Sequence, residues 1–490
     1  MIVTYLIRGA SAIIVLLVVI KIFYQYVQMR IKLFKHGTKL KGPTAWPIVG
    51  NAFDFMVPSN QMMYKWSSLK KIYGSPYRLW AGSQLIVFVT EPEHVKTVLM
   101  STKVKDKGST YKFLTPFLGH GLFTGSGDLW KMQRQAISPI FTPKMMTEYM
   151  PSFSSHCELL NRKLQSIPNG KLIDIYAEIA PFTYDIVCET LLGTKVRFAQ
   201  NTWKSEFFHL AELGYEIVFE RMIKSLYQSD VLFYFSKRYN DYVKIQKLVD
   251  NFTRTILKDK QSDTQKPFDT CLDRILKHDL TEKQQMDATY VIFTASQESI
   301  TTIISFVILM LAIHPDIQQK AHEELDRVLG TEDDEIPFTI ELLNSLEYLD
   351  MCIKEVLRLY PIGHIIQREC KQDFRLNNDV VLPSGCSIGV GIYAMHRDPN
   401  IWPEPDKFMP ERFTREAVLN RHPYAYVPFS AGPMNCIGKI YADLLMKSVA
   451  ATILRNNRFE CDYKRVEEIT LKTDISIRPQ KGYPVRIYSR

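Results

Sequence analysis

The stretch Phe429-Ser430-Ala431-Gly432-Pro433-Met434-Asn435-Cys436-Ile437-Gly438 decides the fold. It places Phe429, Gly432, Cys436 and Gly438 at fixed offsets, directly before an expected helix over 437–455. A helix start and free backbone N–H groups stabilise a thiolate, the glycines permit turns and close approach of a flat ligand, and the phenyl ring shields the sulfur. A buried structural cysteine is the alternative, but this pattern arises by chance in roughly one such sequence in a thousand. We therefore predict a ligating thiolate at Cys436.

Two charged motifs precede this loop in the chain. Glu355 and Arg358 lie three residues apart on an expected helix that ends before Pro361, so they share one face and can pair. Arg412 follows in the segment 410–413, Pro-Glu-Arg-Phe. Either motif alone would indicate a surface ion pair, but their order before the cysteine loop favours a shared function.

With these motifs in this order, the chain resembles the cytochrome P-450 superfamily over essentially its whole length. The stretch Tyr111–Leu122 and the cysteine loop are similar to the insect and mammalian family-4 branch, and most like its insect-type portion. The resemblance implies a mainly α fold with a smaller β portion (α+β). It also implies haem b with an axial thiolate from Cys436, which favours O–O cleavage, and a Glu355–Arg358–Arg412 network beneath the haem.

The resemblance further implies contacts to the haem propionates. Trp130 and Arg134, one helical turn apart, and Arg368 match these positions. The family usually has a further arginine two residues before the thiolate, where this chain has Met434. A buried propionate without its cation is costly, so either Arg134 and Arg368 compensate or haem is held more weakly. His396 matches another family position and is at least as readily explained as a structural histidine.

The segment Met286–His314, stopped by Pro315, is predicted to form one long helix. In the resembled family the middle of this helix carries an acid and an alcohol, which are Glu298 and Ser299 here. Together they can relay protons to dioxygen. The alternative for Ser299 is a hydroxyl bonded back to the preceding turn.

Two positions of this helix depart from the family pattern. Ser296 replaces a glycine, which reduces the helix distortion that makes room for dioxygen and puts coupling in doubt. Ala295 stands where many family-4 members have a glutamate that esterifies a haem methyl. We therefore predict haem that is not covalently esterified to the protein.

The N-terminal segment is predicted to be a membrane anchor. Residues 1–30 are rich in apolar side chains, and Arg8 and Lys21 lie near the ends of the expected helix, where long charged side chains reach the headgroups. A cleaved signal peptide and a buried helix are the alternatives. A Pro/Gly-rich hinge over 31–51 and a catalytic domain over 52–490 follow. The basic residues after the anchor predict a catalytic domain on the cytosolic face, and the resemblance implies the endoplasmic reticulum as its membrane.

Composition excludes several other classes. The net charge is +9, but lysine and arginine are spread along the chain, which disfavours a nucleic-acid partner. Eight cysteines without close pairing are typical of reduced thiols rather than of a disulfide framework or zinc site.

The predicted reaction is insertion of one oxygen atom of dioxygen into an apolar substrate. An aromatic-rich stretch over 207–235 matches the region that roofs the pocket and enters the membrane in the resembled fold, so we expect a fatty acid, a pheromone-like lipid or a xenobiotic. No flavin- or nicotinamide-binding glycine motif is found, so we expect an external electron donor. The resemblance implies that this donor is NADPH–cytochrome P-450 reductase, with cytochrome b5 as a further candidate. The alternatives are a reductase-independent haem-thiolate isomerase or dehydratase, and a non-catalytic haem protein that binds lipids or odorants.

Overall fold

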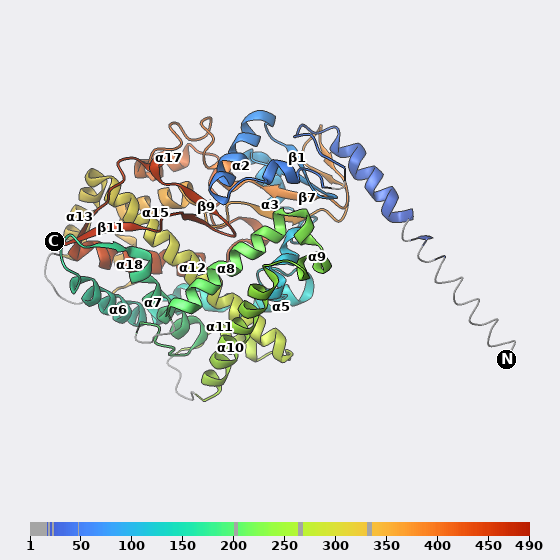
Figure 1. Cartoon of the computed structure of the whole chain (residues 1–490). Helices are drawn as coiled ribbons and strands as arrows, with labels where there is room; N and C mark the ends of the chain where they lie inside the picture. The colour runs from blue at the N-terminus through green and yellow to red at the C-terminus, as the bar shows by residue number, and fades with distance from the viewer. Residues whose placement is uncertain are drawn as a thin grey trace.

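The computed structural model describes residues 24–47, 49–199, 204–262, 268–330 and 336–490, together with Leu17, Ile20 and Lys21. Most of the body is helical; some strands lie beside helix α2, and the last strand of the chain lies on the opposite side of the molecule next to the C-terminus (Figure 1). The longer helices are α2 (Ser59–Tyr73), α5 (Gly127–Ile137), α6 (Pro143–Gln165), α7 (Ile175–Val187), α8 (Lys204–Ile223), α10 (Tyr239–Ser262), α12 (Glu282–Ile313), α13 (Pro315–Leu329), α15 (Glu347–Leu359) and α18 (Lys439–Asn456). The shorter ones are α3 (Pro92–Leu99), α4 (Thr115–Leu118), α9 (Asp230–Tyr234), α11 (Cys271–Leu276), α14 (Ile340–Asn344), α16 (Ile392–Met395) and α17 (Arg415–Leu419).

The strands of the described residues form small sheets rather than one continuous layer. The largest has the order β1-β2-β7-β4, in which β2 and β7 are parallel and the outer pairs are antiparallel. Its strands are β1 (Tyr77–Ala81), β2 (Gln84–Val89), β4 (Ile366–Glu369) and β7 (Ser387–Val390). The smaller sheets contain β3 (Leu172–Asp174), β11 (Pro484–Ser489) and β8 (Asn457–Glu460); β9 (Leu471–Thr473) and β10 (Ile477–Pro479); and β5 (Phe374–Arg375) and β6 (Val381–Leu382). The predicted mainly α architecture with a smaller β portion is confirmed.

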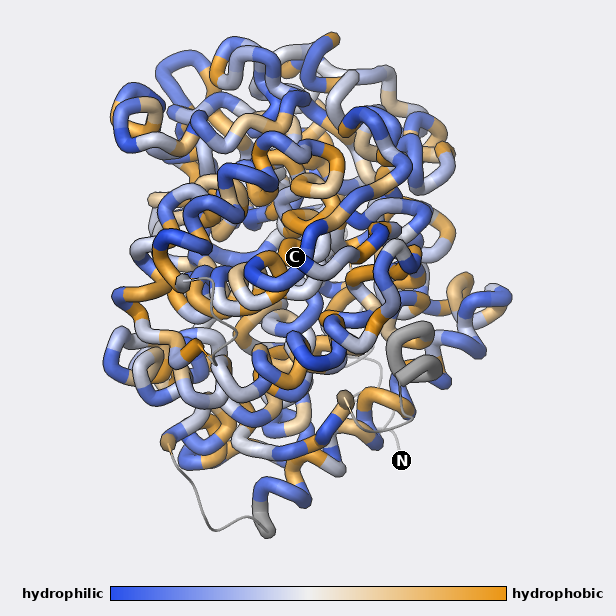
Figure 2. Tube along the Cα trace, turned by 90° about the vertical axis from the view of Figure 1, so that its left-hand side faces the viewer, coloured by the Kyte–Doolittle hydropathy of each residue, from blue (hydrophilic) through white to orange (hydrophobic). Residues whose placement is uncertain are grey.

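Helix α12 forms the centre of the molecule. It begins with a capping box, in which Gln284 N donates to Thr281 Oγ1 and Thr281 N donates to Gln284 Oε1. It ends before Pro315, as predicted. Its residues are buried around nearly the whole circumference, because α7, α10, α15 and α18 pack around it. The outer helices instead alternate between apolar and polar segments (Figure 2).

Helix α12 is also the one helix among the described residues that is long and apolar enough to cross a membrane. Because 83% of its most apolar window is buried inside the protein, it is a core helix. The predicted anchor over 1–30 lies largely outside the described residues. Residues 24–37 are helical and project from the body in Figure 1, while Leu33 of this helix is buried against the large sheet. The hinge was expected over 31–51, but residues 31–37 of this segment are helical.

Candidate active site

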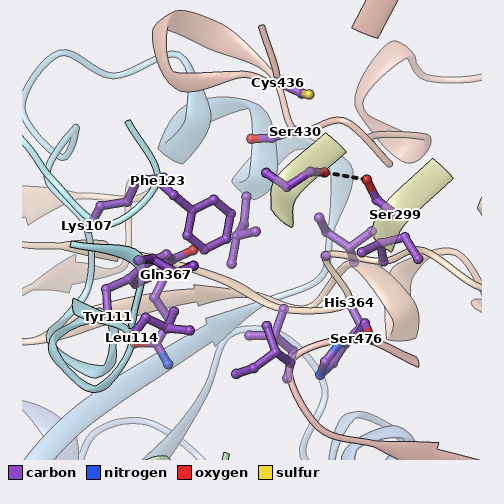
Figure 3. A pocket seen from close by; sticks show the side chains of 18 of the residues that line it. Lys107, Tyr111, Leu114, Phe123, Ser299, His364, Gln367, Ser430, Cys436 and Ser476 are labelled. Carbon is purple, nitrogen blue, oxygen red and sulfur yellow. Dashed lines mark hydrogen bonds between the residues drawn. The ribbon is translucent and has the colours of Figure 1, made fainter. Parts of the chain in front are cut away.

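A cavity of about 500 Å³ lies between helices α5 and α12, strand β4 and the cysteine loop. Most of its wall is apolar, and Cys436, Ser299 and His364 face it from different elements (Figure 3). Apolar walls with a few convergent polar groups are typical of sites for small molecules and cofactors. The cavity is therefore the candidate active site.

The cysteine loop presents a thiol to this cavity. A backbone hydrogen bond from Cys436 N to Phe429 O, 2.9 Å long, closes the loop. Gly432 has φ of +72°, and a Cβ there would lie 2.1 Å from the Leu99 carbonyl oxygen, so only glycine fits. By contrast, a Cβ at Gly438 would meet only Phe141 Cε1 at 3.7 Å. Contacts within the protein therefore require glycine at position 432, whereas the space beside Gly438 is open and can admit a ligand.

Cys436 differs from the other cysteines in its surroundings. Six of the others are buried and Cys461 is partly buried, whereas the Cys436 side chain is open to the cavity. Its position inside the body raises the pKa of the thiol, while a hydrogen bond from the Gly438 backbone and the charge of Arg134 act in the opposite direction. Helix α18 begins at Lys439, so its positive N-terminal end lies beside the sulfur.

Helix α5 presents Trp130 and Arg134 to the same cavity. Arg134 donates from Nη1 to the backbone oxygen of Asn435 and from Nη2 to Asn435 Oδ1, both at 2.7 Å. The side chain of Met434 also lines the cavity and brings no charge. Arg134 is thus fixed next to the loop position where the resembled family has its extra cation.

The structure adds a lysine that the sequence reasoning missed. Lys107 and Arg368 line the cavity, and their residues form an isolated bridge between the two chain segments. In the described part of the chain the Lys107 ammonium has no carboxylate partner and lies over the rings of Tyr111 and Phe123, 5.1 and 5.7 Å from their centroids. Burial, Arg368 and Arg134 lower the pKa of Lys107 to about 7. No sequence signal marked this lysine, because only the fold brings it to Arg368.

Arg368 itself is buried and donates to the Gln367 carbonyl oxygen at 3.1 Å. No carboxylate of the described residues pairs with it. A buried cation without a counter-charge is costly, so three cations around one cavity indicate a ligand that carries carboxylates. The residues present therefore fit haem, which combines an iron for the thiol with two propionates.

Helix α12 contributes a small polar face. Ala295 is exposed in the middle of this otherwise buried helix because it faces the cavity, together with Ser296 and Ser299. Ser299 Oγ donates to Ala295 O at 2.6 Å (Figure 3). This is the back-bonded arrangement considered from the sequence. The oxygen keeps its lone pairs and can still accept a proton or hydrogen bond from the cavity side.

Glu298 is buried beside this face and also lines the cavity. Its Oε2 accepts a hydrogen bond from Tyr176 Oη at 2.7 Å, and its Oε1 lies 3.8 Å from Arg478 Nη1. Burial raises the pKa of Glu298, while Arg478 and Tyr176 act in the opposite direction. A carboxyl with a raised pKa between a cation and a phenol can both hold and release a proton.

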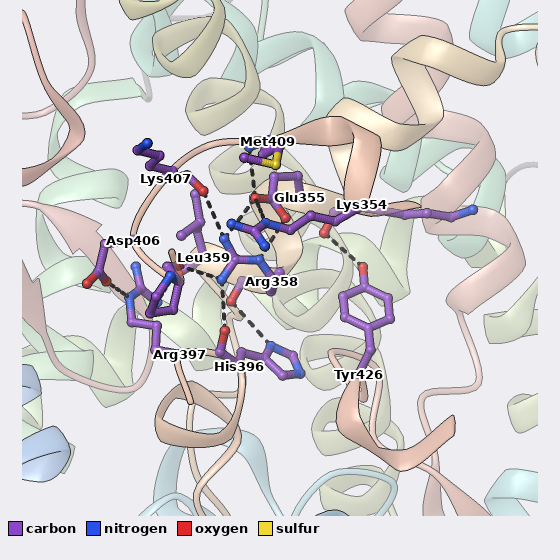
Figure 4. A network of polar contacts seen from close by, with 12 residues as sticks. Lys354, Glu355, Arg358, Leu359, His396, Arg397, Asp406, Lys407, Met409 and Tyr426 are labelled. Carbon is purple, nitrogen blue, oxygen red and sulfur yellow. Dashed lines mark hydrogen bonds and ion pairs between the residues drawn. The ribbon is translucent and has the colours of Figure 1, made fainter. Parts of the chain in front are cut away.

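The Glu355–Arg358–Arg412 group lies away from the cavity in a fully buried cluster (Figure 4). Arg358 donates from Nε to Glu355 Oε2 at 2.7 Å and from Nη2 to Glu355 Oε1 at 2.8 Å. Arg412 Nε donates to Glu355 Oε1 at 3.3 Å. The other Arg358 hydrogens go to the carbonyl oxygens of His396, Pro405 and Lys407. The cluster thus ties helix α15 to the irregular segment that leads to the cysteine loop.

His396 belongs to this support and does not face the cavity. It is fully buried, its Nε2 accepts from Val427 N at 3.1 Å, and burial with neighbouring arginines lowers its pKa to about 3. The ring is therefore neutral and holds the start of the loop, which agrees with the structural alternative.

A mainly helical body, a thiol open to an apolar cavity, and cations on the cavity wall that have no carboxylate partner among the described residues are the features of a haem-thiolate protein. Comparison with known families agrees, since the Cytochrome P-450 family profile matches residues 40–486. The chain belongs to the cytochrome P-450 family. It is a monooxygenase whose cofactor is haem with iron and a cysteine thiolate ligand.

Several similar curated proteins carry family-4 names. The chain is 30% identical to cytochrome P-450 4c3 of Drosophila melanogaster, over 95% of this chain and 92% of that protein. It is 30% identical to cytochrome P-450 4c21 of Blattella germanica, over 98% of both chains. It is also 30% identical to cytochrome P-450 4V2 of Homo sapiens, over 91% of this chain and 89% of that protein. The family-4 resemblance predicted from the motifs is confirmed.

Proposed function

We propose that this enzyme inserts one oxygen atom of dioxygen into an apolar small molecule, using electrons from NADPH–cytochrome P-450 reductase. Cytochrome b5 is a second candidate electron donor. The observation that carries the proposal is that one apolar cavity joins the Cys436 thiol to the Ser299 face of α12. A substrate in this cavity lies in a dry environment between both groups, where positioning is effective.

Haem supplies the oxygen chemistry when it is bound, and the chain positions it. Cys436 is the proposed axial ligand, with Phe429, Gly432 and Gly438 shaping its loop. Trp130, Arg134 and Arg368 are the proposed propionate contacts, and the absence of a carboxylate on Ala295 supports haem held without an ester bond. The Glu355–Arg358–Arg412 cluster holds the segment that precedes the loop.

Glu298 and Ser299 are the proposed proton carriers. Glu298 holds a proton at its carboxyl, which its burial favours, and exchanges it with groups around Tyr176 and Arg478. Ser299 Oγ donates a hydrogen bond to Ala295 O and accepts a hydrogen bond on the cavity side, so it can position a proton donor there without losing its own proton. Protons supplied by positioned side chains of this kind raise rates roughly 10²–10⁴-fold.

The proposed setting is the endoplasmic reticulum membrane, with the catalytic body on the cytosolic side. Around α9, the side chains of Leu226, Val231, Leu232, Tyr234 and Phe235 are all at least half exposed. A cluster of exposed apolar side chains is typical of a membrane or protein contact. Its position supports entry of an apolar substrate, such as a lipid or a xenobiotic, from the bilayer.

The test is a reconstitution of the purified full chain. The reduced carbon-monoxide complex should show the thiolate-ligated spectrum, and NADPH with the reductase should yield oxygenated products from an apolar substrate panel. If peroxides are rearranged without the reductase, the enzyme is an isomerase or dehydratase and the proposal is wrong. If ligands shift the haem spectrum but no product forms, the protein has a lipid-binding role instead.

A further inference from the structure

The cavity has a polar end that the proposed catalytic groups do not use. His364 lies between α15 and β4, and Ser476 lies between β9 and β10; both line the cavity and are more than nine-tenths buried. In the described part of the chain, neither His364 Nδ1 nor Ser476 Oγ has a hydrogen-bond partner. Leaving buried polar atoms unpaired costs free energy. A bound molecule that hydrogen-bonds to them removes this cost.

The side chains of His364 and Ser476 are themselves uncharged. Burial lowers the pKa of His364 to about 4, against an opposing contribution from the Ile362 backbone, so its ring is neutral at physiological pH and carries one donor and one acceptor nitrogen. The Ser476 hydroxyl also donates and accepts. The end can therefore bind an oxygen or hydroxyl group from two directions.

Asp474 also lines the cavity beside Ser476 and brings a negative charge to this end. Asp474 is within electrostatic reach of His364 and accepts a hydrogen bond from the Ser476 backbone N at 3.0 Å. Arg478 is already engaged by Asp474 at 2.6 Å, by Glu212 at 3.4 Å and by Glu298 at 3.8 Å. The carboxylate of a bound acid would be repelled by Asp474 here, and among the described residues at this end it would find no cation that is not already paired.

The cations of the cavity wall lie elsewhere. Among the described lining residues they are Lys107, Arg134 and Arg368. Arg134 is bound to the cysteine loop, and its charge and that of Arg368 act on Lys107. Figure 3 shows Lys107 on the opposite side of the cavity from His364 and Ser476. These three cations therefore serve the cofactor side and not the polar end.

We infer that His364 and Ser476 form the anchoring subsite for the substrate, and that the substrate is an apolar molecule with an uncharged oxygen function, such as an ester, ketone or alcohol, rather than a free carboxylic acid. This inference rests on the proposed function of the cavity as the substrate site. It selects among the lipid and xenobiotic classes, because ionised fatty acids are disfavoured. The apolar remainder of the molecule packs along the wall formed by Phe219, Met222, Val291, Ile292 and Ile475.

The experiment compares four chain-matched ligands at neutral pH: a medium-chain fatty acid, its methyl ester, the corresponding alcohol and the parent alkane. Affinities are measured on the haem-loaded enzyme by optical titration and by calorimetry, which also detects binding away from the iron. We expect the ester and alcohol to bind at least roughly tenfold more tightly than the acid, because a pocket with unpaired polar groups discriminates strongly. An acid that binds as tightly as the ester overturns the inference.

Variants of His364 and Ser476 test whether these two residues cause the preference for the ester and the alcohol. Ser476→Ala and His364→Leu should reduce the affinity for the ester and alcohol roughly tenfold and leave that for the alkane unchanged, while His364→Gln should retain most of the preference. Ser236→Ala is the matched control, since it removes another buried unpaired hydroxyl that does not line the cavity. An unchanged preference in Ser476→Ala and His364→Leu contradicts the inference. If a variant does not fold, the ligand series on the natural chain decides alone.

The two proposals fail in different ways. Oxygenation of an apolar substrate together with tight binding of the free acid retains the proposed function and rejects the subsite. Selective binding of the ester without any NADPH-dependent product retains the subsite and rejects the proposed function.

Discussion

Arg134 holds Asn435, the residue before the candidate thiolate, through two hydrogen bonds of 2.7 Å. One reaches the backbone oxygen and the other the side-chain oxygen, so the planar guanidinium fixes both the path and the rotation of this residue. The pair connects helix α5 to the cysteine loop. Arg134 therefore contributes to loop geometry and, with its remaining donors, to the cationic side of the cavity.

Replacement of Cys436 by alanine should abolish haem binding. The alanine removes the proposed thiolate and leaves the propionate side unable to retain the cofactor alone. We expect loss of pigment, of the spectrum of the reduced carbon-monoxide complex and of turnover. Cys461→Ala, at a partly buried cysteine that is not among the cavity-lining residues, is the control; a coloured and active Cys436→Ala protein would falsify the assignment.

Met434→Arg should raise haem occupancy. Met434 lines the cavity close to Arg134 and brings no charge to the propionate side. An added cation there gives a buried carboxylate a partner. The haem-to-protein ratio after purification under limiting haem measures the effect. Met434→Leu is the control for side-chain volume, and equal occupancy in the natural chain and the arginine variant would show that Lys107, Arg134 and Arg368 already suffice.

Haem affinity should depend on pH through Lys107. Without an anionic partner, burial and two arginines lower the pKa of this lysine to about 7, and a propionate would raise it again. The contribution of Lys107 to haem affinity is then fully present below pH about 7, where the lysine is already protonated in the haem-free protein. It is lost as the pH rises further, because the haem-free lysine is then neutral and haem binding must take up a proton.

Lys107→Met should weaken haem binding at low pH and remove this part of the pH dependence. Rates of haem transfer to an acceptor protein, recorded across neutral and alkaline pH, measure both. Lys112→Met is the control, because Lys112 lies nearby in sequence and does not line the cavity. Parallel pH profiles for the natural chain and Lys107→Met would exclude the proposed contact.

Glu298→Gln and Ser299→Ala should uncouple NADPH consumption from product formation. Glutamine cannot release a proton, and alanine has no hydroxyl on the cavity side, so product per NADPH should fall roughly tenfold or more. Ser299→Thr retains the hydroxyl and should retain coupling. The ratio of product to NADPH consumed, with peroxide measured alongside, gives the result. Unchanged coupling in both variants would remove these residues from the mechanism.

Glu355→Ala should destabilise the protein far more than the loss of a surface pair. It leaves Arg358, which is fully buried, without its carboxylate, at a cost of about 3–5 kcal/mol. In Glu411→Gln, the broken pair with Lys320 has side chains 44% and 53% exposed and should cost roughly 1 kcal/mol or less. Urea unfolding of both variants measures the difference. Similar losses in the two proteins would refute a buried structural role.

The sequence predicted those features that depend on local spacing. The long helix α12 was predicted over 286–314 from an apolar run that ends at Pro315, and the structure places it at Glu282–Ile313. The family follows from fixed offsets around Cys436 and from the order of the charged motifs. Both are encoded by neighbours in the chain, and the structure and the comparisons confirm them.

Groups that meet only through the fold could not be predicted in this way. Lys107 reaches Arg368 because its segment lies beside strand β4, and Arg478 reaches Glu298 from a strand near the C-terminus. Met434 indicated that the usual cation is missing at this position, but the sequence did not show which residues surround it. Charge, burial and pairing at these sites are set by distant segments, and a one-dimensional pattern does not contain their distances.

The sequence alone thus determined the class of protein and predicted its thiolate, because a loop before a helix is a local structure with local requirements. The tertiary structure decided which cations line the cavity and which uncharged groups lie at its other end. The reason is that desolvation and Coulomb interactions depend on the groups that surround a side chain in space.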